Sequence, residues 1–137
     1  MTLSRRELAR LLGRSAAVWA AWWAHGCTSI GWRDAPSVSA QQAVDERLDR
    51  TLADPATRES SKALGRAYLE SYGGSRDELR REIAWAMDRV ATRTKPSDDL
   101  FRRAVHADFA EGEMVETSGW LLSHTEARFS ALVALAE

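Results

Sequence analysis

The sequence contains little cysteine and no long hydrophobic run. Its single cysteine, Cys27, excludes a disulfide within the chain, so the fold has to be held together by packing alone. No stretch reaches the roughly 18 consecutive apolar residues that a membrane-spanning helix needs. With 137 residues and ordinary apolar and charged fractions, the chain is predicted to form one small globular domain.

The chain also lacks a cluster of basic residues. Its net charge is −1, but four arginines and only one glutamate precede Cys27, which leaves the remainder mildly acidic. A protein that binds nucleic acid normally carries a basic face. The charge distribution therefore predicts no nucleic-acid partner.

Catalytic and cofactor motifs are missing as well. His106 and Asp108 are two residues apart, which places them about 200° around a helix, so they cannot form a ligand pair by themselves. Ser123 lacks the Gly-x-Ser-x-Gly elbow of a nucleophilic serine, and the neighbouring Glu126 is more simply a helix-capping residue. Gly-rich phosphate and dinucleotide loops are absent. We therefore predict no catalytic residue, no cofactor and no metal site.

Two groups of side chains leave both a structural and a functional interpretation open. An acidic stretch is either a solvated edge or a rim that meets a basic partner; it consists of Glu111, Glu113 and Glu116. Aromatic residues at helical spacing are either core residues or candidates for an interface, and they are Tyr68, Tyr72 and Trp85, with Trp32 as a further candidate outside the helices.

The first 27 residues have the order of a signal peptide. A charged segment precedes the apolar run from Ser15 to Ala24, and small residues follow. Arg5 and Arg6 within "SRRELAR" resemble the twin-arginine export signal. The alternative is an amphipathic first helix of a cytosolic domain. Three tryptophans within five residues favour the signal, because such rings suit lipid headgroups better than a small core.

Cys27 ends the apolar run and follows Gly26, which resembles a lipoprotein box whose cysteine becomes acylated. Ala24 and His25 depart from the usual box residues, so simple cleavage, an uncleaved anchor and a buried thiol remain alternatives. Residues 28–38 are rich in Ser, Thr, Gly and Pro and lack any period, which predicts a tether.

Residues 39–137 are predicted to form a helical domain. Apolar residues recur with helical spacing after residue 39, over 59–72, behind a capping pattern at Ser75, from about Ser97 to Gly112, and over 127–136. The breaks between these helices are marked by Asp54-Pro55, Gly73-Gly74 and Lys95-Pro96. Extended residues flank a Ser118-Gly119 turn. We predict an all-α bundle of about four to five helices with a short extended or hairpin segment near 113–122, preceded by an N-terminal signal helix.

The C-terminal third also predicts a set of mutually supporting contacts. Trp120 is expected to bury its ring between the last two helices after a tight turn at Gly119. Ser123 and Glu126 are expected to cap the last helix, and Arg128 to reach back to Asp108 or to an acidic neighbour. Phe109 is expected on the buried face of the helix that ends at Gly112. All of these residues are interpreted more simply as a determinant of the fold than as an active site.

The same stretch, "ADFAEGEMVETSGWLLSHTEARFSALVAL", resembles the tail of small twin-arginine-exported bacterial proteins. Its matching positions are Asp108, Phe109, Gly112, Gly119, Trp120, Leu122, Ser123, Thr125, Glu126, Ala127 and Arg128. Ser118 and Phe129-Ser130 depart from the pattern, which is similar to that of small subunits of membrane-associated flavin sugar and alcohol dehydrogenases.

The resemblance implies a non-catalytic accessory subunit of an exported oxidoreductase complex. In that arrangement this chain supplies the export signal and a membrane tether, and a larger partner carries a flavin, haem or molybdenum cofactor. Two other expectations remain: a free-standing envelope lipoprotein or helical binding module, and a small enzyme. The expected location is the periplasm or cell envelope, in association with the membrane.

Overall fold

The structure is a computed structural model that describes residues 34–91 and 100–136. The predictions for the export signal, Cys27, the tether up to residue 33, Trp32 and the helix start at Ser97 lie outside the described residues. Ala35–Glu137 forms one compact unit, which begins four residues before the predicted start of the helical domain.

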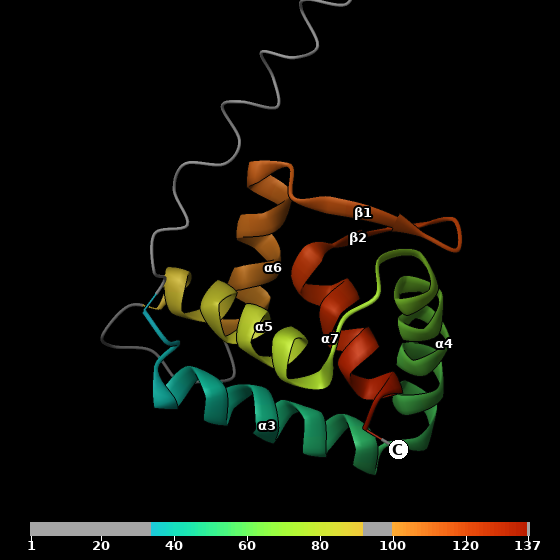
Figure 1. The fold of residues 1–137 in the computed structure, drawn as a ribbon, viewed down its shortest axis with the longest axis horizontal. Coiled ribbons are helices and arrows are strands. Elements are labelled where there is room, and N and C mark those ends of the chain that lie inside the picture. Colours follow the sequence, from blue (N-terminus) through green and yellow to red (C-terminus); the bar gives the residue numbers. More distant parts are fainter. Residues whose placement is uncertain (1–33, 92–99, 137) are drawn as a thin grey trace, which may run out of the picture. The chain divides into compact units, whose positions relative to one another are not determined.

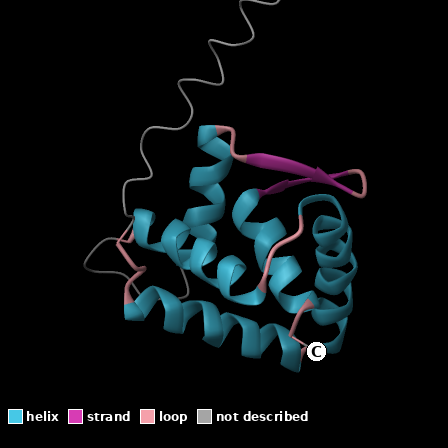
Figure 2. Cartoon of the chain, in the orientation of Figure 1, coloured by secondary structure: helices cyan, strands magenta, loops and turns pink. Residues whose placement is uncertain are grey.

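The described part of this unit is mostly helical, as predicted, with one antiparallel hairpin (Figures 1 and 2). Its elements in chain order are α3 (Val38–Ala53), α4 (Pro55–Tyr72), α5 (Arg76–Val90), α6 (Leu100–Glu111), β1 (Met114–Thr117), β2 (Trp120–Ser123) and α7 (His124–Ala134).

Helices α3 and α4 are joined by a single residue. Asp54 has an extended backbone with φ −100° and both ends α3 and precedes α4. The prediction that α4 begins near Glu59 was wrong, because Pro55 occupies the first helical position, where the missing amide hydrogen costs nothing. The same proline that stops α3 therefore starts α4.

Helix α5 begins where its capping pattern predicts. The Ser75 hydroxyl accepts the Glu78 backbone amide at 3.3 Å, and Gly73 before it has a left-handed φ of 71° that ends α4. The other end was predicted wrongly, because α5 stops at Val90 rather than at Lys95-Pro96.

The hairpin lies between α6 and α7, and its register pairs Met114 with Ser123 and Thr117 with Trp120. Its turn residues Ser118 and Gly119 have φ values of 51° and 78°. Two positive φ angles are the signature of the tight hairpin turn whose twist matches that of the strands. The predicted hairpin and its turn are confirmed.

Helix α7 lies in the middle of the unit, with contacts to α3, α4, α5 and α6 and to both strands (Figure 1). It begins at His124, three residues before the predicted start, because Ser123 is its cap. The cap is a complete capping box: the Ser123 hydroxyl accepts the Glu126 amide at 3.0 Å, and a Glu126 carboxylate oxygen accepts the Ser123 amide at 3.1 Å.

Two groups of buried side chains pack on opposite sides of α7. The larger joins α3, α5, α6 and α7 around the fully buried Ile83, Met87 and Leu132. The smaller joins α4, α5, β1 and α7 through Tyr68, Leu79, Val115, Ala127 and Ala131. Burial of these apolar surfaces is the main source of stability in the fold.

Helix α4 approaches α7 closely at Gly65. A β-carbon built on Gly65 would lie 2.0 Å from the carbonyl oxygen of Ser130. Only a glycine allows the two helix backbones to come this near.

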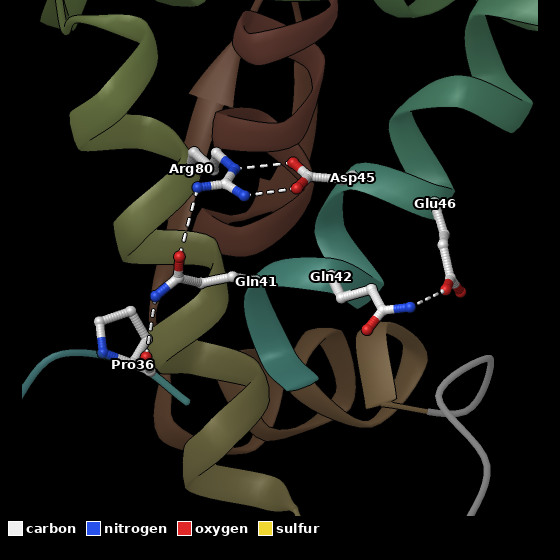
Figure 3. Close-up of polar contacts among 6 residues, drawn as sticks. All are labelled: Pro36, Gln41, Gln42, Asp45, Glu46 and Arg80. Carbon is white, nitrogen blue, oxygen red and sulfur yellow. Dashed lines mark hydrogen bonds and ion pairs between the residues drawn. The ribbon is translucent and has the colours of Figure 1, made fainter. Parts of the chain in front are cut away.

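A polar clamp joins α3 to α5 on the outside of the core (Figure 3). The Arg80 guanidinium donates two hydrogen bonds to Asp45, one of them from Nε at 2.7 Å, and a longer one of 3.4 Å to Gln41. Gln41 in turn donates to the carbonyl oxygen of Pro36 at 2.9 Å. The hydrogen bond to Asp45 raises the pKa of Arg80, so the guanidinium keeps its charge.

Candidate functional site

Asp108 is the centre of a polar network at the base of the hairpin. The side chain is only 3% exposed, although it lies on α6, one helical turn before the end of that helix. Its carboxylate accepts the Thr125 backbone amide at 2.8 Å and the Arg89 guanidinium at 3.0 Å. A buried carboxylate needs such partners to offset its loss of water. The network thereby ties α5, α6 and α7 together.

Arg89 takes the place that the sequence predicted for Arg128. Besides Asp108 it contacts Glu111 with an Nη1 to Oε2 distance of 3.0 Å. The prediction that Arg128 would reach Asp108 was wrong, because the first turn of α7 already presents the Thr125 backbone amide to that carboxylate and α5 brings Arg89 alongside. No spacing rule could have found Arg89, since the contact joins two separate helices.

Both ends of the hairpin are fixed to this network. At the start of β1 the Glu113 amide donates to the Asp108 carbonyl oxygen at 2.8 Å, and the Glu113 carbonyl accepts the His124 amide at 3.0 Å. At the end of β2, Ser123 is fully buried and forms the capping box of α7. The hairpin is therefore anchored at its base while its turn extends away from it.

The hairpin exposes large apolar side chains. Trp120 is 65% exposed and Leu121 59% exposed, while Met114 is exposed to a smaller degree. Val115 and Leu122, which pair across the strands, turn inward and pack in the smaller cluster. Leu121 pairs with Glu116, which is also exposed. We call Met114, Glu116 and Leu121, which lie on one side of the strands, the hairpin face. Trp120 lies on the other side, with Thr117 and Leu122.

The prediction that Trp120 is buried between the last two helices was therefore wrong. Its partner across the strands is the buried Thr117, but Trp120 lies next to the turn, and its ring remains mostly exposed. Phe109, which was expected on the buried face of α6, is 41% exposed, because Asp108 takes the buried position. His106 is exposed whereas Asp108 is buried, in agreement with their predicted placement on different faces.

The other aromatic interface candidates are not gathered on one surface. Tyr68 is buried, and it stacks on Tyr72 with a distance of 4.9 Å between the ring centres. Tyr72 is 58% exposed at the end of α4. Trp85 is half-buried on α5 beside Arg81, whose guanidinium carbon lies 5.7 Å from the ring centre. Of the three, Tyr72 alone presents a largely exposed ring.

A shallow hollow lies at the junction of α3 and α4, lined by Arg47, Arg50, Thr51, Asp54 and Thr57. The Thr57 hydroxyl donates to the Asp54 carboxylate, and this hydrogen bond lowers the pKa of Asp54. Within residues 34–91 and 100–136, no three side chains of His, Cys, Asp or Glu gather as a metal site would require. Among the helices described there, none is both long and apolar enough to cross a bilayer.

Comparison with protein-family models, with curated proteins and with solved structures gave no match for this chain.

Proposed function

We propose that this chain is a non-catalytic accessory subunit of an exported oxidoreductase complex. It supplies the export signal and a membrane tether, and it stabilises a larger partner that carries the flavin, haem or molybdenum cofactor. No cofactor is assigned to the chain itself. Its place in the cell is the periplasmic side of the envelope.

The sequence supports export and tethering through three features. Arg5 and Arg6 resemble the twin-arginine signal, Cys27 follows an apolar run as in a lipoprotein box, and the tail resembles that of small exported subunits. The twin-arginine pathway carries proteins that fold before they cross, commonly because they hold a cofactor. A small subunit with the signal and a cofactor-bearing partner would cross together.

The observation that carries the proposal is the exposure of Trp120 and Leu121 on an anchored hairpin. One of these side chains lies on each side of the hairpin, so a partner that encloses the hairpin would cover both apolar surfaces. Both side chains belong to the same tail that resembles the accessory subunits. Their exposure supports a docking role for that tail in addition to its role in the fold.

Affinity purification of the tagged full chain from its native envelope tests the proposal. We expect one larger protein to co-purify in a fixed ratio and to show the visible absorption of a flavin, haem or molybdenum centre. The chain expressed without that protein should be folded and inactive. Turnover by the chain alone, or its isolation from the envelope as a lone monomer, would refute the proposal.

The alternative function is a free-standing envelope lipoprotein or a helical binding module. The hollow at the α3 to α4 junction is the observation that favours it, because arginine and threonine side chains there surround an open depression. This alternative requires a stable monomer in the native envelope, so the same purification separates the two functions.

A further inference from the structure

The main chain of β1 carries hydrogen-bonding groups that the hairpin does not use. In a hairpin with a two-residue turn, the residues that flank the turn exchange hydrogen bonds, and every second pair after them does the same. The 3.0 Å bond from the His124 amide to the Glu113 carbonyl continues this alternation. Glu116 lies between two such pairs, so it directs both its amide and its carbonyl away from β2.

The outer edge of β1 is open over a longer stretch than that of β2. Within the described residues, no further strand pairs with either edge. On β2, the Ser123 amide already donates to a Glu126 carboxylate oxygen at 3.1 Å. On β1, the carbonyl of Met114 and both main-chain groups of Glu116 have no partner among the described residues. Both residues are exposed, and Figure 1 shows β1 at the rim of the unit.

This edge is held in an extended conformation by contacts on its other sides. The Glu113 amide donates to the Asp108 carbonyl at 2.8 Å and fixes the start of the strand. Val115, between the two open positions, is buried and packs in the same cluster as Tyr68 of α4. A strand that is already ordered loses less entropy when another strand pairs with it. The open edge is therefore a prepared template for strand addition.

Glu116 determines which strands can pair with this edge. Its exposed carboxylate forms no ion pair within the described part of the chain. A two-fold axis through Glu116 would place the same carboxylate of a second copy directly opposite, where like charges destabilise a sheet. A register with Met114 opposite Glu116 is also poor, because the Met114 amide already donates to the Gly112 carbonyl at 3.0 Å. A strand with lysine or arginine opposite Glu116 would instead be attracted.

We propose that β1 binds an extended segment of the partner protein as a third strand of the hairpin sheet. The inference rests on the proposed function in so far as that function requires a partner. The segment exchanges two main-chain hydrogen bonds with Glu116 and donates a third to the Met114 carbonyl. It presents a lysine or arginine opposite the Glu116 carboxylate, which sets its register.

Variants of Glu116 in the full chain separate the main chain from the side chain. Glu116→Ala removes only the carboxylate, whereas Glu116→Pro also removes the outward amide, which pairing with β2 does not need. We expect the amount of partner that co-purifies from the native envelope to fall by about twofold to fivefold in the alanine variant and by roughly tenfold or more in the proline variant. Val38→Pro, at the exposed first position of α3, is the matched proline control and should leave the amount unchanged.

Charge reversal tests the basic residue of the segment. Glu116→Lys should co-purify with less partner than Glu116→Ala, because the attraction becomes a repulsion. Equal amounts in the lysine and alanine variants would overturn the basic residue opposite Glu116.

Amide hydrogen exchange tests the main-chain bond without any substitution, so it decides the question even where the proline variant fails to fold. In the lone wild-type chain, the Glu116 amide should exchange nearly as fast as in an unstructured peptide, because it has no acceptor. In the purified complex, we expect its exchange to slow by about tenfold or more. The Thr117 amide, which bonds across the hairpin in both states, is the internal reference.

The outcomes separate this inference from the proposed function. An unchanged exchange rate of the Glu116 amide in the complex overturns strand addition, and so does slow exchange in the lone chain, because the edge would then be occupied already. If a cofactor-bearing subunit co-purifies all the same, the proposed function stands without this contact. If the amide is protected by a protein that holds no redox cofactor, strand addition stands and the oxidoreductase function fails. A chain that purifies from the envelope alone refutes both.

Discussion

The carboxylate of Asp108 accepts the backbone amide of Thr125 at 2.8 Å, across 17 residues of chain that include the whole hairpin. Helix α7 is therefore capped twice, by Glu126 and Ser123 from its own sequence and by Asp108 from α6. Because the hairpin lies between the two residues, this hydrogen bond also helps to hold the two ends of the hairpin together.

Removal of the Asp108 carboxylate should destabilise the fold. Asp108→Ala leaves the buried Thr125 amide without an acceptor, and we expect the free energy of unfolding to fall by about 2 kcal/mol, within the usual range for an orphaned buried group. Urea denaturation of the variant and the wild type measures this difference in the free energy of unfolding. Glu111→Ala is the control, since that half-exposed ion pair with Arg89 should contribute less than about 1 kcal/mol. Equal losses in both variants would contradict the central role of Asp108.

Gly65 should not tolerate even one added methyl group. In Gly65→Ala the β-carbon would meet the Ser130 carbonyl oxygen at 2.0 Å, which forces α4 and α7 apart and should cost about 3 kcal/mol. Gly73→Ala, where φ is 71° but nothing lies within 4 Å, should cost only about 1 kcal/mol for the strained backbone. Thermal unfolding of both variants separates the steric clash expected in Gly65→Ala from the backbone strain expected in Gly73→Ala. Similar melting temperatures of the two variants would argue against a close contact between α4 and α7.

Truncation of Trp120 should leave stability nearly unchanged. Since the ring is mostly exposed, Trp120→Ala is expected to change the free energy of unfolding by no more than about 0.5 kcal/mol. Leu132→Ala, at a fully buried position of α7, should cost about 2 to 5 kcal/mol. A loss of that size in the tryptophan variant would restore the original expectation of a buried ring.

The Asp54 carboxylate should contribute a small pH-dependent part of stability. The hydrogen bond from the Thr57 hydroxyl lowers the pKa of Asp54 below its ordinary value of 3.8. Because the folded pKa is the lower one, the stabilisation is present above the unfolded value and disappears as the pH falls through the folded value. Thr57→Val should therefore be less stable than the wild type at neutral pH, with a difference that vanishes in acid. Thr57→Ser retains the hydroxyl and should follow the wild-type curve.

Export should depend on the identity of the two leading arginines rather than on their charge. Substitution of Arg5 and Arg6 by lysine preserves the charge but should leave the protein in the cytoplasm, because a receptor reads the twin-arginine signal. Cell fractionation with immunodetection measures this. Unchanged levels in the envelope would rule out the twin-arginine interpretation.

Local signals in the sequence predicted the local structure well. The capping box of Ser123 and Glu126 and the turn at Ser118-Gly119 depend on residues that are close in the chain, and both are confirmed. Apolar spacing likewise identified the buried stripe of α5, including Ile83. Helix starts were less accurate, since Pro55 can both stop one helix and begin the next.

Contacts between distant segments were beyond the sequence. Arg128 and Arg89 are equally plausible partners for Asp108 until the crossing of α5 and α6 is known. The exposure of Trp120 depends on how far the hairpin extends past the helices beneath it, and that distance cannot be predicted from the residues of the hairpin. The hairpin face therefore emerged only from the three-dimensional arrangement.

The central position of α7 also sets when folding can be completed. This helix follows α3, α4, α5 and α6 in the chain, yet all four pack against it. Until α7 has left the ribosome, the earlier helices can contact one another but cannot bury the apolar faces that they turn toward α7. The native core therefore closes only once α7 is available, and a chain truncated before His124 would leave those faces uncovered for chaperones and proteases to recognise.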